Sequence, residues 1–120
     1  MNTSVTVLRW IIRLLFVVSL ILGIMLWTGN GYTYLKLHMW LGFIISFALL
    51  LLAIIGFVAR IRPVLPLVTL IWAVLLPVLG IAQLRIVPGP NHWTIQVLHV
   101  IIGIGAIGLA EVLGKRSLTA

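Results

Sequence analysis

The fold is decided by residues 34–58, which read YLKLHMWLGFIISFALLLLAIIGFV and carry one lysine and no acidic residue. A helix needs about 20 mostly apolar residues to cross the hydrocarbon core of a bilayer, which is about 30 Å thick. This stretch is longer than that requirement and almost wholly apolar. It is therefore predicted to be a transmembrane helix.

Three other apolar runs have the same character. The four predicted spans are Thr6–Trp27, Tyr34–Val58, Val64–Leu84 and His92–Leu113. The segments between them are short and rich in Gly, Pro or charge, so neighbouring helices must run antiparallel. The first run is too long for the apolar region of a signal peptide, and no A-x-A-like site follows it. The expected fold is all-α: one integral membrane domain over residues 1–120, an up-down four-helix bundle.

The composition agrees with a chain that lies mostly in lipid. Of 120 residues, 63% are hydrophobic, the mean hydropathy is +1.34 and the formal net charge is +7. The basic residues form no cluster of the kind that binds nucleic acid, and instead punctuate the apolar runs as headgroup anchors do. The absence of cysteine excludes disulfides, thiolate metal sites and iron–sulfur clusters.

The distribution of Lys and Arg predicts the orientation. Six basic residues lie on the side of the termini and the second loop: Arg9, Arg13, Arg60, Arg62, Lys115 and Arg116. Only Lys36 and Arg85 lie on the other side. The positive-inside rule then predicts that both termini lie in the cytoplasm. We expect the membrane to be the cytoplasmic membrane of a bacterium or archaeon. An aromatic belt is expected at the outer interface, formed by Trp27, Tyr32, Tyr34, Trp40 and Trp93, with Trp10 at the inner one.

The two halves of the chain share a pattern. Residues 22–42 read LGIMLWTGNGYTYLKLHMWLG, and residues 79–103 read LGIAQLRIVPGPNHWTIQVLHVIIG. Each half has Leu-Gly-Ile near the end of one predicted helix and Leu-His-x-x-x-Gly early in the next. We therefore expect two repeated helical hairpins, related by a pseudo-twofold axis along the membrane normal.

The repeat places two histidines at a similar depth. His38 and His99 lie about 6 Å and about 10 Å below the outer ends of the second and fourth helices. These helices are diagonal partners in an up-down bundle, so the imidazoles can face each other and clamp a haem iron from both sides. Four glycines would leave room for the flat macrocycle. Gly23 and Gly80 would flank its edges, and Gly42 and Gly103 would lie one turn below the histidines.

This arrangement resembles the haem-binding four-helix core of membrane cytochromes b. The resemblance is carried by four residues, Gly23, His38, Gly80 and His99. Cytochromes of this kind often hold two haems, one near each face of the membrane. This sequence has no histidine within residues 39–91 or after His99, so it lacks the ligands for an inner haem. The resemblance therefore implies one bis-histidine haem b near the outer face.

A haem with both axial positions filled transfers single electrons rather than activating oxygen. The sequence thus indicates a small b-type cytochrome, an electron-transfer protein rather than a stand-alone enzyme. It would exchange electrons at the outer face with quinol or a partner subunit; a quinone site and a homo-oligomer stay open. Three residues on that side are candidate partners for haem propionates, although headgroup anchoring explains them equally well: Lys36, Arg85 and His92. His92 could also accept a proton from quinol.

Other classes of protein share parts of this pattern. A non-redox or (bacterio)chlorophyll-binding accessory subunit of a larger membrane complex is the main alternative, because each pigment needs only one axial histidine. Zinc is disfavoured, since two histidines without a nearby carboxylate or thiolate make an incomplete site. A transporter is disfavoured by the lack of polar residues at the membrane midplane.

The half of the bundle near the termini is predicted to be tightly packed scaffold. Small residues at helical spacing allow close helix approach in lipid, and four of them form a stripe: Gly103, Ala106, Ala110 and Gly114. Glu111, the one acidic residue, is expected to pair with Lys115 one turn further along its own helix. Arg9 and Arg13 are expected to reach the headgroups. Pro77 is expected to kink the third helix.

Overall fold

The computed structural model describes residues 2–29, 32–83 and 85–119. Its elements are α1 (Asn2–Trp27), a 3-10 turn η1 (Tyr32–Tyr34), α2 (Leu35–Val58), α3 (Val64–Ala82) and α4 (Trp93–Thr119). All four α-helices are long and apolar enough to cross a membrane. The prediction of an all-α bundle of four long apolar helices is confirmed, and their length and composition indicate an integral membrane protein.

The helix ends differ from the predicted spans. α1 begins before Thr6 and α4 continues past Leu113. The backbone hydrogen bonds of a helix can continue into the headgroup layer, so its ends need not coincide with those of the apolar run. The predicted end of the third span, Leu84, lies outside the described residues, as do residues 30–31 of the first loop.

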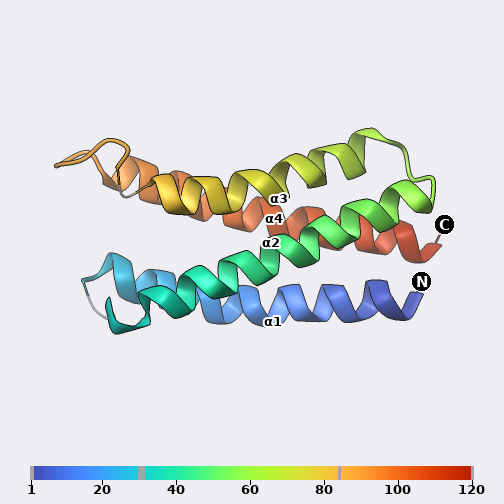
Figure 1. Cartoon of the computed structure of the whole chain (residues 1–120), viewed down its shortest axis with the longest axis horizontal. Helices are drawn as coiled ribbons and strands as arrows, with labels where there is room; N and C mark the ends of the chain where they lie inside the picture. Colours follow the sequence, from blue (N-terminus) through green and yellow to red (C-terminus); the bar gives the residue numbers. More distant parts are fainter. Residues whose placement is uncertain (1, 30–31, 84, 120) are drawn as a thin grey trace.

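The helices form an antiparallel bundle with the two termini at one end (Figure 1). Each helix contacts its neighbours along the chain, α1 also contacts α4, and α2 touches α4 across the middle. We call the end with the termini and the turn at 59–63 the terminus end. The opposite end, with the connections at 28–34 and 83–92, is called the histidine end. This arrangement puts α2 and α4 on the diagonal that the up-down prediction requires.

The apolar core is formed by buried residues from all four helices. It comprises Val5, Ile12, Ile45, Ala48, Leu49, Leu52, Ala73, Leu76, Ile102, Ala106, Ala110 and Leu113. Ala106 and Ala110 are each only 1% exposed, as expected for a stripe of small residues at a close helix contact. The buried residues of α4 begin at Ile102, past His99. The densest packing therefore lies away from the histidine end.

The turn at the terminus end is tight because α2 closes with a Schellman motif. The Ile61 N–H donates to Gly56 O at 3.0 Å, and the Arg60 N–H donates to Phe57 O at 3.1 Å. Arg60 takes a left-handed backbone conformation, with φ of 56°, to make this reversal. The chain then enters α3 at Val64 after only a few residues.

Two buried hydroxyl groups inside the apolar helices are satisfied locally. Ser46 Oγ donates to Gly42 O at 2.9 Å, and Thr69 Oγ1 donates to Leu65 O at 2.8 Å. Such bonds to the preceding turn remove the need for water within lipid. α3 continues through Pro77 to its end at Ala82.

An ion-pair cluster joins α1 to α4 near the terminus end. The Glu111 carboxylate accepts hydrogen bonds from Arg9 Nη2 at 2.6 Å, from Arg13 Nε at 2.5 Å and from Arg13 Nη2 at 2.8 Å. The prediction that Glu111 pairs with Lys115 is therefore wrong, and Arg9 and Arg13 are not simply headgroup anchors. Arg9 and Arg13 on α1 both give Glu111 charge-assisted hydrogen bonds, and Arg13 binds it in bidentate fashion. The single ammonium group of Lys115 cannot match these bonds.

The small-residue stripe makes this pairing possible. A Cβ on Gly114 would collide with the side chain of Arg9, so glycine is needed for the arginine to cross α4 there. A cation–π contact within α1 also positions the Arg13 side chain, with its Cζ 4.8 Å from the centroid of the Trp10 ring.

Candidate functional site

The two histidines singled out by the repeat lie together. His38 on α2 and His99 on α4 have ring centroids 6.3 Å apart and ring planes at 66°. Both side chains are half-buried at the histidine end. Two helices that are diagonal in the bundle, α2 and α4, therefore present their single histidines to each other.

The proton position on His38 follows from its partner. Its Nδ1 lies 3.0 Å from the backbone oxygen of Ser19 on α1, and 3.3 Å from Ser19 Oγ. Because a carbonyl oxygen can only accept, this bond requires the proton on Nδ1. The lone pair then lies on Nε2. Metal-binding histidines typically have this arrangement, with one nitrogen donating to a backbone carbonyl and the other free to bind.

His99 has no such support. Its Nδ1 is buried and has no hydrogen-bond partner among the described residues. The two halves also differ in side chain here, because Ser19 stands four residues before Gly23 whereas the corresponding position before Gly80 is Leu76, which has no hydroxyl. The two imidazoles are thus alike in position but different in their hydrogen bonds.

Gly23 and Gly80 lie directly against the two imidazoles. A Cβ on Gly23 would lie 3.2 Å from His38 Cε1, and one on Gly80 would lie 3.4 Å from His99 Cε1. The sequence pattern predicts that these glycines clear the edges of a macrocycle. In the structure their immediate effect is to give each histidine ring room beside the preceding helix.

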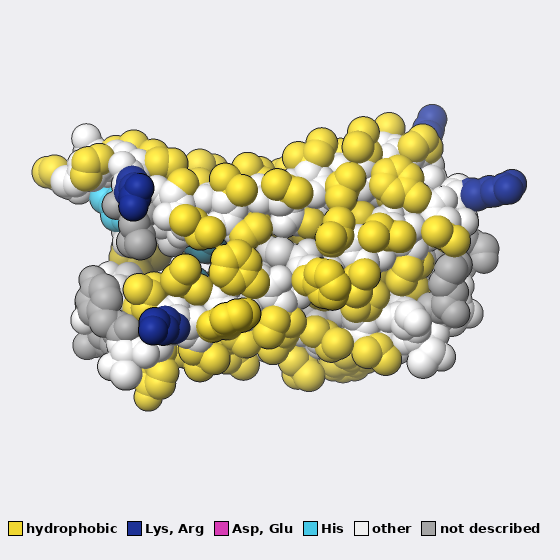
Figure 2. Space-filling view, viewed as in Figure 1, with side chains coloured by type: hydrophobic (Ala, Val, Ile, Leu, Met, Phe, Trp, Pro, Cys, Tyr) yellow, Lys and Arg dark blue, Asp and Glu magenta, His cyan; other side chains and the backbone are white. Residues whose placement is uncertain are grey.

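Gly42 and Gly103, one turn below the histidines, adjoin more open space. A Cβ on Gly42 would meet nothing within 4 Å, and one on Gly103 would meet only Phe16, at 3.9 Å. Figure 2 shows the molecule hollowed between the two hairpins at the histidine end, with histidine side chains (cyan) on its walls. A Cβ could therefore be added to Gly42 or to Gly103 without a collision.

The donor set fits a haem better than a bare metal ion. The described residues contain no group of three or more His, Cys, Asp or Glu that could hold a metal ion. A haem asks for only two axial ligands, since its own four nitrogens complete the coordination. With metal–nitrogen bonds of about 2 Å and each ring centroid about 1 Å beyond its nitrogen, opposed imidazoles have centroids about 6 Å apart. The observed 6.3 Å matches this separation.

The three predicted propionate partners lie at the same end of the bundle but do not join the histidine pair. Lys36 and Arg85 are exposed and make no ion pair within the described ranges 2–29, 32–83 and 85–119. His92 Nδ1 lies 3.3 Å from both Ile86 O and Val87 O. Its ring therefore braces the third loop, where Val87 has a left-handed φ of 49°.

Sequence reasoning missed two residues beside the site. Ser19 holds His38 through its backbone oxygen, a role that any residue type could fill and that leaves no signal in the sequence. Trp72 on α3 donates its indole N–H to Ile102 O on α4 at 2.9 Å, and it lies across Gly105. This bond fixes α4 one turn past His99. A tryptophan opposite a glycine is a packing relation that appears only once the helices are docked.

Comparison with protein-family models, with curated proteins and with solved structures gives no match to this chain.

Proposed function

We propose that this chain is a small b-type cytochrome that holds one haem b between His38 and His99. The observation that carries the proposal is the meeting of the two rings, 6.3 Å apart, from diagonal helices of the bundle. An ionisable side chain within a membrane is costly unless it has a function or a partner. Two of them that meet from diagonal helices are best explained by a ligand that both bind.

The residues around the pair have distinct roles in this proposal. His38 and His99 would supply the axial nitrogens, with Ser19 O keeping the proton of His38 on Nδ1. Gly23 and Gly80 seat the two imidazoles. The macrocycle would lie between the two rings, and Gly42 and Gly103, one turn below, would present no Cβ to it. Lys36, Arg85 and His92 lie at the same end of the bundle and would be the polar groups available to the propionates.

When bound there, a haem supplies reversible one-electron transfer. The chain's own part is to hold the two imidazoles in place and to keep water away from the apolar walls. The sequence contains no second pair of histidines that could hold an inner haem. We therefore propose that electrons enter and leave at the histidine end, with quinol or a partner membrane subunit.

The orientation is part of the same proposal. The terminus end carries six of the eight basic residues, and the positive-inside rule places it in the cytoplasm. Trp27, Tyr34, Trp40 and Trp93 are exposed near the histidine end, as an aromatic belt requires. The haem would then lie near the outer face. In each hairpin, a glycine of the first helix lies against the histidine of the second helix. This shared contact supports the proposal that the two hairpins are a repeat.

The main alternative is a pigment-binding or non-redox accessory subunit. One axial histidine is enough for each (bacterio)chlorophyll, so such a protein has no need for its imidazoles to meet. The close approach of His38 and His99 favours the cytochrome.

An absorption spectrum of the purified protein, from cells supplied with haem, tests the proposal. We expect sharp b-type bands on dithionite reduction and about one haem per chain. His38→Ala and His99→Ala should each abolish low-spin haem, whereas the matched control His92→Ala should retain it. Circular dichroism of each variant checks that the helices persist. A colourless preparation, or retention of the bands without His38 and His99, would refute the assignment.

A further inference from the structure

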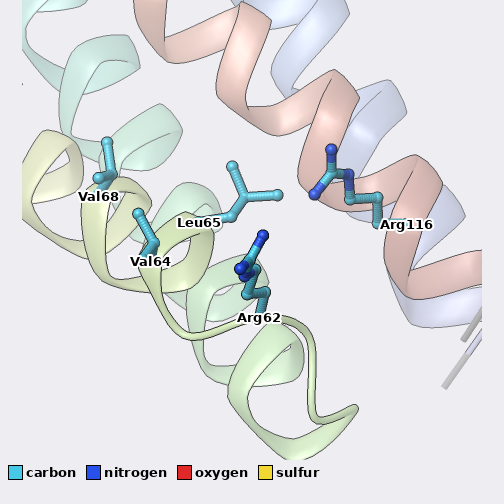
Figure 3. A pocket seen from close by; sticks show the side chains of 5 residues that line it. All are labelled: Arg62, Val64, Leu65, Val68 and Arg116. Atoms are coloured by element: carbon cyan, nitrogen blue, oxygen red, sulfur yellow. The ribbon is translucent and has the colours of Figure 1, made fainter.

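A second candidate site lies at the terminus end, on the outside of the bundle between the start of α3 and the end of α4. It is lined by Arg62, Val64, Leu65, Val68 and Arg116. Figure 3 shows the side chains of Arg62 and Arg116 both reaching toward Leu65, so that their guanidinium groups converge beside it at one end of this pocket. The histidine pair is at the opposite end, so this pocket is independent of the proposed haem.

The two arginines have no side-chain counter-ion within the chain. Glu111 is the only acidic residue, and its carboxylate is held by Arg9 and Arg13. An anion lying between converging guanidiniums offsets their mutual repulsion. No acidic side chain of this chain is left to supply it, so Arg62 and Arg116 are placed to bind an anion brought by another molecule.

The shape of the pocket indicates which kind of anion it takes. Arg62 precedes α3 and Arg116 lies in the last turn of α4, so both belong to the headgroup layer of the membrane. Below Arg62 the wall is apolar, with Val64, Leu65 and Val68 following α3 into the hydrocarbon. A ligand that fits both parts has a charged phosphate at the top and a hydrocarbon chain beneath it.

We propose that this pocket binds an anionic phospholipid, with its phosphate between Arg62 and Arg116 and one acyl chain along Val64 and Val68. Guanidinium groups bind phosphate oxygens in bidentate fashion, and basic pockets between membrane helices are suited to acidic lipid headgroups. The ligand is a lipid of the membrane leaflet at the terminus end, because a free phosphate would make no use of the apolar wall.

Matched charge variants separate this pocket from the general positive charge of the terminus end. The test pair is Arg62→Gln with Arg116→Gln. The control pair is Arg60→Gln with Lys115→Gln, which removes the same charge from the neighbouring positions that do not line the pocket. A third form, Arg62→Lys with Arg116→Lys, keeps the charge but loses the bidentate geometry.

Binding is measured with phosphatidylglycerol titrated into the protein in neutral detergent, with native mass spectrometry to count retained lipid and phosphatidylcholine as the reference lipid. Each arginine near the membrane surface is expected to contribute about fivefold to the affinity for phosphatidylglycerol. We therefore expect the test pair to weaken this binding about 25-fold. The control pair should weaken it by less than about fivefold, and the lysine form should fall between the two. Circular dichroism confirms that each variant is helical before its binding is compared.

Three results would overturn the proposal. One is an equal loss in the test and control pairs, which would mean that diffuse charge attracts the lipid. Another is equal retention of phosphatidylglycerol and phosphatidylcholine by the unaltered protein. The third is displacement of bound phosphatidylglycerol by millimolar glycerol phosphate, which would show that the pocket takes a soluble phosphate and does not use its apolar wall.

Discussion

Replacement of Glu111 by glutamine tests how the bundle is held at its terminus end. The change keeps the size of the side chain but removes the charge that accepts three hydrogen bonds from Arg9 and Arg13. The Glu111 side chain is 34% exposed and that of Arg9 only 18%, so the cluster is neither fully solvated nor fully buried. Exposed pairs contribute up to about 1 kcal/mol, whereas breaking a buried pair costs about 3–5 kcal/mol.

After allowance for solvent screening, we expect Glu111→Gln to lower the free energy of unfolding by about 1–2 kcal/mol. Unfolding is followed by circular dichroism during titration with SDS in mixed micelles. The double variant with Arg9→Gln should show a coupling of about 1 kcal/mol in a double-mutant cycle.

Lys115→Gln is the matched control, because Lys115 is the partner expected from the sequence alone. It should change stability by less than about 0.5 kcal/mol. The cluster has no such role if Lys115→Gln destabilises the protein as much as Glu111→Gln does, or if the coupling between Glu111 and Arg9 is zero within error.

Three further predictions concern glycines and a tryptophan at helix contacts. Gly23→Ala should displace His38 by a few tenths of an ångström and reduce haem retention in the purified protein more than Gly80→Ala does. The reason is that the added Cβ lies 3.2 Å from His38 Cε1 in the first variant and 3.4 Å from His99 Cε1 in the second. The opposite order would contradict this difference in clearance. Trp72→Phe removes the indole bond to α4 and should cost about 1 kcal/mol in the same SDS titration, and a neutral result would show that the bond contributes nothing. Gly56→Ala places a Cβ 2.8 Å from a leucine methyl and 3.2 Å from a proline ring, so it should cost about 1–3 kcal/mol, whereas Gly108→Ala, with nothing within 4 Å, should be neutral or slightly stabilising.

The helices could be predicted from the sequence because lipid leaves the backbone few choices. Without water to satisfy peptide groups, an apolar run of sufficient length must form a helix, and short loops must reverse its direction. The meeting of His38 and His99 was also within reach, since the repeated Gly and His positions fix two residues at one depth on helices that lie diagonally. The repeat supplied long-range information that a single helix does not contain.

The partners of the polar groups could not be predicted in the same way. Glu111 seemed suited to Lys115 because that spacing is fixed within one helix, whereas its bonds to Arg9 depend on how α1 is rotated and how closely it approaches α4. The support of His38 by Ser19 has the same origin, since a backbone oxygen is available on every residue and only docking selects one. The partners of long side chains and of backbone acceptors are therefore determined by tertiary packing.

The position of the core has a consequence for the order of events in the cell. The buried apolar residues and the cluster around Glu111 hold the four helices together near the terminus end and the middle, without using the histidines. Membrane insertion and assembly of the bundle then need not wait for the supply of a cofactor. If the chain holds the proposed haem, it should accumulate as a folded apoprotein when haem is scarce and bind haem later without new protein synthesis.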